Sequence, residues 1–114
     1  MAMNGRFIVE WAQFRAVPGT DETTMLQASR AMQLEFLDRQ DGFIRRELFK
    51  GPNDRWADLL YWESREAAER ALGKAFSSPA CSRYFALIDD VGGSEPGPGM
   101  LHLEQVECYS QAPR

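Results

Sequence analysis

The sequence predicts an α+β fold, the ferredoxin-like βαββαβ arrangement, with one four-stranded antiparallel sheet and the helices on a single face. Three observations predict it. The expected elements follow the order β-α-β-β-α-β, two adjacent strands are joined by a short turn, and the second helix is rich in alanine. The 114 residues suit one domain, residues 1–114, with a core over residues 6–109.

The first strand is expected at residues 6–15, which are rich in aromatic and β-branched types and stop at a Pro-Gly turn at 17–19. Thr20 is expected to cap a helix whose first turn carries two acids, since acids favour the positive end of the helix dipole. This helix is predicted to run to about Gln40, where Asp-Gly at 41–42 ends it.

A β-hairpin is expected next, from strands at 43–50 and 56–63 that are joined by the turn-rich residues 51–55. Ser64 is expected to cap the second helix. The apolar half of that helix carries alanines 67, 68, 71 and 75 together with Leu72 and Phe76.

A short third helix is predicted to begin at Pro79, a residue that is favoured in the first turn. It carries apolar residues at helical spacing, namely Cys81, Tyr84, Phe85 and Ile88. Residues 91–99 form a loop by composition, and residues 100–109 are expected to form the last strand, beside the first strand.

Both faces of the predicted sheet are apolar, because alternate residues of a strand point to opposite faces. One set holds Phe7, Val9, Trp11, Phe43, Leu59, Tyr61, Leu101 and Leu103. The opposite set holds Ile8, Ala12, Phe14, Ile44, Leu48, Leu60, Trp62 and Val106. Two helices cover only one face, and a monomer rarely exposes so large an apolar surface. The sequence therefore predicts a homodimer that buries the second face.

Composition excludes several classes of protein. Seventeen acidic and thirteen basic residues give a net charge of −4, which argues against nucleic-acid binding because phosphate contacts need a basic surface. No apolar stretch has the length of a membrane span, and the N-terminus lacks the apolar core of a signal peptide, so we expect a cytoplasmic protein without a membrane partner. Cys81 and Cys108 are expected to be packed thiols.

Ionisable residues inside the predicted strands are the candidate site. Glu10, Arg46, Asp58 and His102 share the face of Trp62, and Glu104 belongs to the same set. Clustered buried carboxylates have perturbed pKa values, which are common at catalytic sites. The alternative is an ion-paired network that fixes the register of the dimer. A single histidine with scattered acids lacks the spacing of a metal site, so no metal is expected.

A recurring pattern joins the third strand to the second helix: an aromatic residue ends the strand, and an acid, a serine cap and an alanine-rich helix follow. It is carried by Trp56-Ala57-Asp58 and Trp62-Glu63-Ser64-Arg65-Glu66-Ala67-Ala68, with further matches at 17–19 and 41–46. Over about residues 6–109 the sequence resembles the antibiotic biosynthesis monooxygenase-like family of dimeric α/β barrels. This resemblance implies a dimer whose two sheets enclose a barrel, with a pocket between sheet and helices in each protomer.

Members of that family include cofactor-free quinone-forming monooxygenases, haem-degrading enzymes and small proteins without a known substrate. Haem-degrading members use an Asn on the first strand, a Trp in the second helix and a following His, and this sequence matches none of the three. The cofactor-free members use an Asn, a Trp, a Tyr and an Arg around a phenolic substrate. By residue type, Trp62, Tyr61, Tyr84 and Arg46 match, whereas no predicted strand contains Asn.

The resemblance thus implies a monooxygenase that acts on a small hydrophobic, aromatic or polyketide-like molecule without a bound cofactor. We expect His102 or Glu10 to be the base and Arg46 to stabilise the substrate oxyanion. Substrate contacts are expected from Trp62, Asp58, Tyr61, Tyr84 and Phe14. Two alternatives stay open: a non-catalytic ligand-binding or stress-associated dimer, and a small isomerase or cyclase that uses the same pocket without oxygen.

Overall fold

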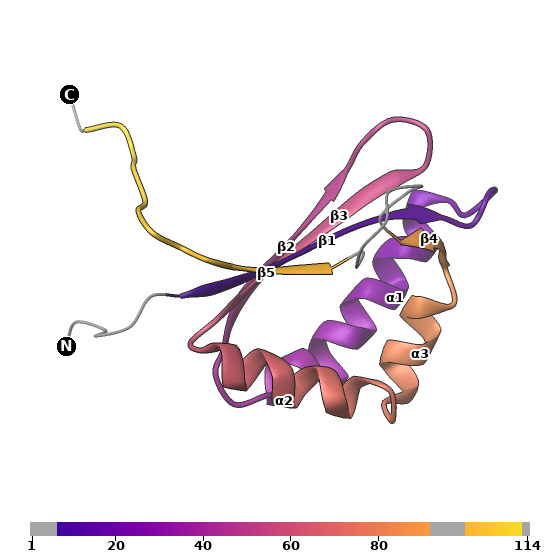
Figure 1. The fold of residues 1–114 in the computed structure, drawn as a ribbon. Coiled ribbons are helices and arrows are strands. Elements are labelled where there is room, and N and C mark those ends of the chain that lie inside the picture. The colour runs from indigo at the N-terminus through magenta and orange to yellow at the C-terminus, as the bar shows by residue number, and fades with distance from the viewer. Residues whose placement is uncertain (1–6, 92–99, 113–114) are drawn as a thin grey trace.

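An antiparallel sheet forms one layer of the molecule, and three helices cover one of its faces (Figure 1). The computed structural model describes residues 7–91 and 100–112. Its sheet has five strands, one more than predicted: β1 (Ile8–Ala16), β2 (Phe43–Lys50), β3 (Arg55–Trp62), β4 (Ile88–Val91) and β5 (Met100–Glu104). In the described part of the chain, no helix is long and apolar enough to cross a membrane.

The strand order confirms the prediction that the last strand lies beside the first. β2 pairs with β3 and β3 with β1, and the free edge of β1 pairs with both β4 and β5. The additional strand is β4, which pairs with β1 at Phe14–Ala16, whereas β5 pairs at Ile8–Ala12. Ile88 therefore belongs to a strand rather than to the third helix, because its backbone finds its partners on β1. Of the predicted loop 91–99, residues 92–99 lie outside the described residues.

β5 ends earlier than the predicted strand at 100–109. Its last backbone contact is the hydrogen bond that the Gln105 amide donates to the Phe7 carbonyl, at 2.9 Å. Residues 105–112 have no regular secondary structure and run away from the sheet (Figure 1). Cys108 lies in this segment and is exposed, which corrects the prediction that it packs in the interior.

The first helix, α1 (Glu22–Glu35), is capped by Asp21 and not by Thr20. The Asp21 carboxylate accepts a hydrogen bond from the Thr24 amide at 2.8 Å, so the cap lies one residue later than predicted. The helix also ends sooner, since Phe36 leaves the helical conformation and η1 (Leu37–Arg39) follows as a short 3₁₀ turn. This break allows the adjacent Phe36 and Leu37 side chains both to be buried.

The second helix, α2 (Arg65–Ala75), begins as predicted: the Ser64 hydroxyl accepts a hydrogen bond from the Ala67 amide. Its buried side is formed by alanines 67, 68, 71 and 75. Gly42 lies against this helix with a φ of +85°, and a Cβ atom there would lie 2.5 Å from Ala67 Cβ. Leu72 and Phe76 lie on the same half of the helix as Ala71 and Ala75 but remain 36% and 74% exposed.

The third helix, α3 (Pro79–Phe85), begins at the predicted proline and is capped by Ser78. Its buried residues include Cys81 and Tyr84. Both side chains point to the space between the helices and the sheet, where the candidate site lies.

Strand alternation divides the sheet as predicted, with one correction in β2. The register shifts between Phe43 and Arg45, so Phe43 pairs with Trp62 and their rings meet edge to face at 5.4 Å. This bulge inserts Ile44 as an extra residue and moves Phe43 to the helix-covered face. Ile44 is correspondingly 39% exposed.

None of the described helices lies on the opposite face (Figure 1), which carries large apolar side chains. On β1 and β3 its side chains are half-buried by their neighbours, and on β5 Leu101 and Leu103 are 46% and 49% exposed. We call this surface the outer face; its large apolar members are Val9, Trp11, Leu59, Tyr61, Leu101 and Leu103.

Candidate functional site

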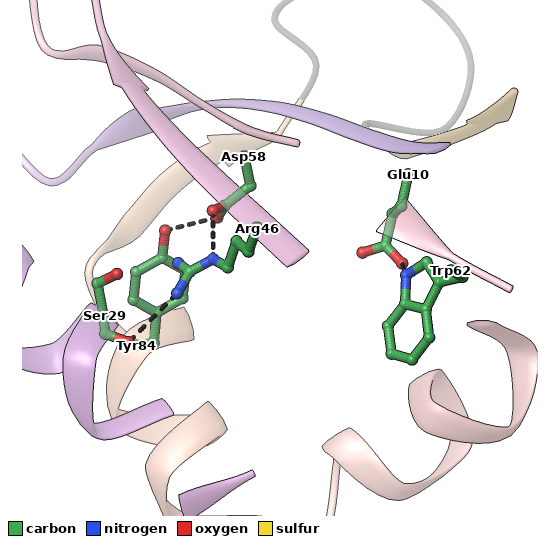
Figure 2. A network of polar contacts seen from close by, with 6 residues as sticks. All are labelled: Glu10, Ser29, Arg46, Asp58, Trp62 and Tyr84. Atoms are coloured by element: carbon green, nitrogen blue, oxygen red, sulfur yellow. Dashed lines mark hydrogen bonds and ion pairs between the residues drawn. The ribbon is translucent and has the colours of Figure 1, made fainter. Parts of the chain in front are cut away.

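A pocket of about 410 Å³ lies between the helix-covered face of the sheet and the helices. Its walls are mostly apolar. The sheet contributes Ala12, Phe14, Leu60 and Trp62, and the helical layer contributes Met32, Phe36, Leu37, Ala71, Ala75 and Phe85. Two polar clusters interrupt this wall, and Figure 2 shows them as separate groups.

The first group, the Asp58 cluster, consists of Arg46, Asp58 and Tyr84. Arg46 Nε donates to Asp58 Oδ1 at 2.7 Å, and the Tyr84 hydroxyl donates to Asp58 Oδ2 at 2.6 Å (Figure 2). The guanidinium also donates from Nη1 to the Ser29 carbonyl, which ties β2 to α1. The side chains of Arg46 and Asp58 are only 5% and 8% exposed. The cluster is therefore a buried ion pair with a phenol attached.

Burial and neighbouring charge fix the protonation of this cluster. Burial raises the pKa of Tyr84, and the charge of Asp58 raises it further, so the phenol stays protonated and remains a donor. Burial alone lowers the pKa of Arg46, but the charge of Asp58 and the hydrogen bond to it outweigh burial, and the net shift is upward. Arg46 therefore remains the cation that neutralises Asp58.

The second group, the Glu10 cluster, consists of Glu10, Trp62 and His102. Trp62 Nε1 donates to Glu10 Oε1 at 3.2 Å (Figure 2). His102 pairs with Glu10 in the β1–β5 register, and its Nε2 atom lies 3.5 Å from the same oxygen. This contact has the distance of an ion pair but not the geometry of a hydrogen bond, since the buried Nε2 atom has no hydrogen-bond partner among the described residues.

Burial raises the pKa of Glu10 above its ordinary value. The nearby His102 and the hydrogen bond from Trp62 lower it, while the charge of Asp58 raises it again. Burial prevails, so the carboxyl holds its proton more tightly than a solvated glutamate does. A carboxylate of this kind is a stronger base than usual.

The structure brings five of the predicted site residues to the pocket. The lining includes Glu10, Phe14, Asp58, Trp62 and Tyr84. Glu10, Arg46, Asp58 and His102 form two separate pairs and not one cluster.

Three predicted site residues lie elsewhere. Arg46 and His102 are absent from the pocket lining and contact the carboxylates that do line it. Tyr61 is on the outer face, where Arg45 lies over its ring at 4.4 Å from the centroid. The opposite direction of Tyr61 follows from strand alternation, since its neighbour Trp62 points into the pocket.

Sequence reasoning missed the contribution of α1 and η1 to the pocket wall. Met32, Phe36 and Leu37 all line it. A signal was present, because two adjacent large apolar residues at the end of an amphipathic helix are not accommodated on one helical stripe. Cys81 also lines the pocket, and burial raises the pKa of its thiol, so it contributes a neutral group.

Among the residues that the structure describes, no group of three or more His, Cys, Asp or Glu side chains is arranged to hold a metal ion.

No known family model matches the sequence, and no curated protein matches it. Solved structures do match the fold. SnoaB, a cofactor-independent oxygenase from Streptomyces nogalater, is 17% identical, with a TM-score of 0.63 over 92% of this chain and 96% of that chain. A candidate antibiotic biosynthesis monooxygenase from Bordetella bronchiseptica is 15% identical, with a TM-score of 0.65 over 91% and 99%.

A protein of unknown function from Nitrosomonas europaea is 12% identical, with a TM-score of 0.64 over 98% of this chain and 100% of that chain. At these identities the likeness shows the fold. It is the fold of the antibiotic biosynthesis monooxygenase-like proteins, as the resemblance implied.

Proposed function

We propose that the chain is an oxygenase that acts on a small hydrophobic aromatic molecule without a bound cofactor. The observation that carries the proposal is a buried carboxylate, Glu10, that lines an otherwise apolar pocket and has His102 behind it. The fold that the chain shares with SnoaB, a cofactor-independent oxygenase, supports the proposal.

Glu10 is the proposed base. Its raised pKa makes it a better proton acceptor near neutral pH than a solvated glutamate, and the apolar wall keeps water away from the anion that forms. His102, whose Nε2 atom lies 3.5 Å from Glu10 Oε1, is a positioning residue in this proposal. Trp62 holds the carboxylate in place through its Nε1 donor.

The proposed reaction converts a ring methylene, as in an anthrone, into a carbonyl. Glu10 removes one methylene proton, and the resulting carbanion transfers an electron to O₂. The carbon and oxygen radicals combine, and the proton returns to give a hydroperoxide. Loss of water, with the second methylene hydrogen, leaves the carbonyl. The balance is one substrate and one O₂ to one quinone and one water, and the oxidant is the dissolved oxygen itself.

Oxygen uptake with a panel of anthrones tests the proposal. The wild-type protein is expected to consume O₂ above the buffer rate with equimolar quinone formation. Glu10→Gln should lower the rate by about 100-fold, because general base catalysis typically contributes that much. The matched control is Glu47→Gln, the same change on β2 at a partly exposed position, which should leave the rate unchanged.

Two outcomes contradict the proposal. Uptake that does not exceed the buffer rate, from a protein that binds the same compounds, favours a non-catalytic binding protein. Turnover of the substrates under argon favours an isomerase or cyclase.

We also propose that the outer face is covered by a second copy of the chain. Its apolar side chains form one patch across β5, β1 and β3, because Leu103 pairs with Val9 and Val9 with Tyr61. A sheet face is well suited to a two-fold partner, since the same residues serve both copies. None of the helices in residues 7–91 and 100–112 covers that face (Figure 1).

Sedimentation tests the homodimer. The wild-type protein is expected at twice the mass of the chain at micromolar concentration. Leu103→Lys should shift it to the monomer, because a symmetric interface would bury the new charge twice. Leu34→Lys is the matched control, since Leu34 is 66% exposed on α1, away from the outer face. A wild-type monomer, or equal effects of the two lysines, would refute this assembly.

A further inference from the structure

The ionisable oxygen groups that line the pocket are acidic, and the described lining contains no basic side chain. Its ionisable oxygen groups are the carboxyls of Glu10 and Asp58 and the hydroxyl of Tyr84, and no Lys, Arg or His belongs to the described lining. The two nearby basic side chains, Arg46 and His102, are absent from this lining and contact the carboxylates. A ligand in this pocket therefore meets carboxylate oxygens before it meets any positive charge.

The hydrogen-bond donors of the lining are already in use. Trp62 Nε1 donates to Glu10, and the Tyr84 hydroxyl donates to Asp58. Gln13 also belongs to the lining, but strand alternation directs its exposed side chain to the outer face. Each carboxylate has lone pairs beyond those that these donors occupy, because two oxygens offer about four acceptor sites. The pocket thus offers hydrogen-bond acceptors, and a complementary ligand must supply hydrogen-bond donors.

The pocket also opposes additional negative charge. Burial raises the pKa of its own Glu10, and the charge of Asp58 acts in the same direction. A ligand carboxylate would lose its water in the same surroundings without gaining a cation. Deprotonation of the substrate does not change the total charge of the pocket. The substrate becomes an anion, and Glu10 becomes neutral when it takes up the proton.

From these contacts we infer that the pocket selects uncharged polyhydroxylated aromatic molecules, whose hydroxyls donate to Glu10 and Asp58, and rejects the same ring system bearing a carboxylate. This inference rests on the proposed function for its substrate class. It adds that the two carboxylates that line the pocket determine which members of the class bind.

Binding of matched quinones tests the inference. Anthraquinones lack the reactive methylene, so they bind without being consumed. The set is a dihydroxyanthraquinone, its carboxylate derivative and its carboxamide derivative, titrated at pH 8 and followed by tryptophan fluorescence. The carboxamide has nearly the size of the carboxylate and no charge. We expect the neutral pair to bind at least about tenfold more tightly than the carboxylate, because like charges held close are strongly unfavourable.

Two variants separate the causes. Glu10→Gln keeps an acceptor for Trp62 and removes one carboxylate, so it should narrow the discrimination severalfold, while Glu47→Gln should preserve it. Equal or tighter binding of the carboxylate overturns the inference, as does an unchanged ratio in Glu10→Gln or no binding of the neutral quinones. If the protein prefers the neutral quinones but consumes no oxygen with anthrones, the oxygenase proposal is refuted and the inference stands. If it consumes oxygen but does not prefer the neutral quinones, the inference is refuted and the oxygenase proposal stands.

Discussion

Replacing Asp58 by alanine is expected to lower the free energy of unfolding by about 3–5 kcal/mol, the typical result of removing one partner from a buried ion pair. The change leaves the Arg46 guanidinium uncompensated in the interior and removes the acceptor of the Tyr84 hydroxyl. Urea unfolding followed by circular dichroism measures the loss.

The double variant Arg46→Met/Asp58→Leu distinguishes an unpaired charge from lost packing. It should be clearly more stable than Asp58→Ala, because no buried charge remains. The matched surface pair is Arg83 with Glu35, in which Arg83 Nη2 lies 3.4 Å from Glu35 Oε1. Both side chains are 56% exposed. Glu35→Ala should change stability by less than about 1 kcal/mol. An Asp58→Ala variant as stable as Glu35→Ala would show that the buried pair contributes nothing.

Replacing Trp62 by alanine is expected to cost about 3–5 kcal/mol of unfolding free energy, the usual range for a fully buried tryptophan. The ring is 1% exposed, packs against Phe43 and forms part of the pocket wall. The variant should therefore lose stability and ligand affinity together. A variant that loses ligand binding but keeps its stability would mean that the ring belongs to the pocket and not to the core.

Trp62→Phe is the matched control, since it keeps most of the ring and removes only the Nε1 donor. That donor lowers the pKa of Glu10, so its loss should raise this pKa further. The proposed base works in its deprotonated form, and activity rises as pH passes through its pKa. The ascending limb of the pH-rate profile should therefore move to higher pH in Trp62→Phe. If the ascending limb stays in place or moves to lower pH, the Trp62 donor does not lower the pKa of the base.

Much of the fold follows from local signals. The turn-rich residues 51–55 predict the hairpin, Ser64 predicts the start of α2, and strand alternation places Glu10 and Asp58 on the face of Trp62. Each of these depends on residues near one another in the chain. β4 was not predicted, because its four residues become a strand only through pairing with the end of β1.

Strand alternation predicts which face of the sheet the site residues occupy, but not which of these residues contact one another. Arg46 reaches Asp58 across β2 and β3 through a long side chain, and Tyr84 completes that cluster from α3. These contacts depend on register and on how a helix packs, neither of which alternation reveals. The bulge at Ile44 has the same origin, since nothing in the sequence of β2 marks where an extra residue enters.

The alternation of β1 has an evolutionary consequence. Glu10 points into the pocket, and the next residue, Trp11, points to the outer face. Under the proposed ligand site and the proposed homodimer, point substitutions along this strand would alter ligand preference and self-association as independent traits. An insertion or deletion of one residue would exchange both sets at once. We expect descendants of this sequence to diverge in β1 by replacement while its length stays constant.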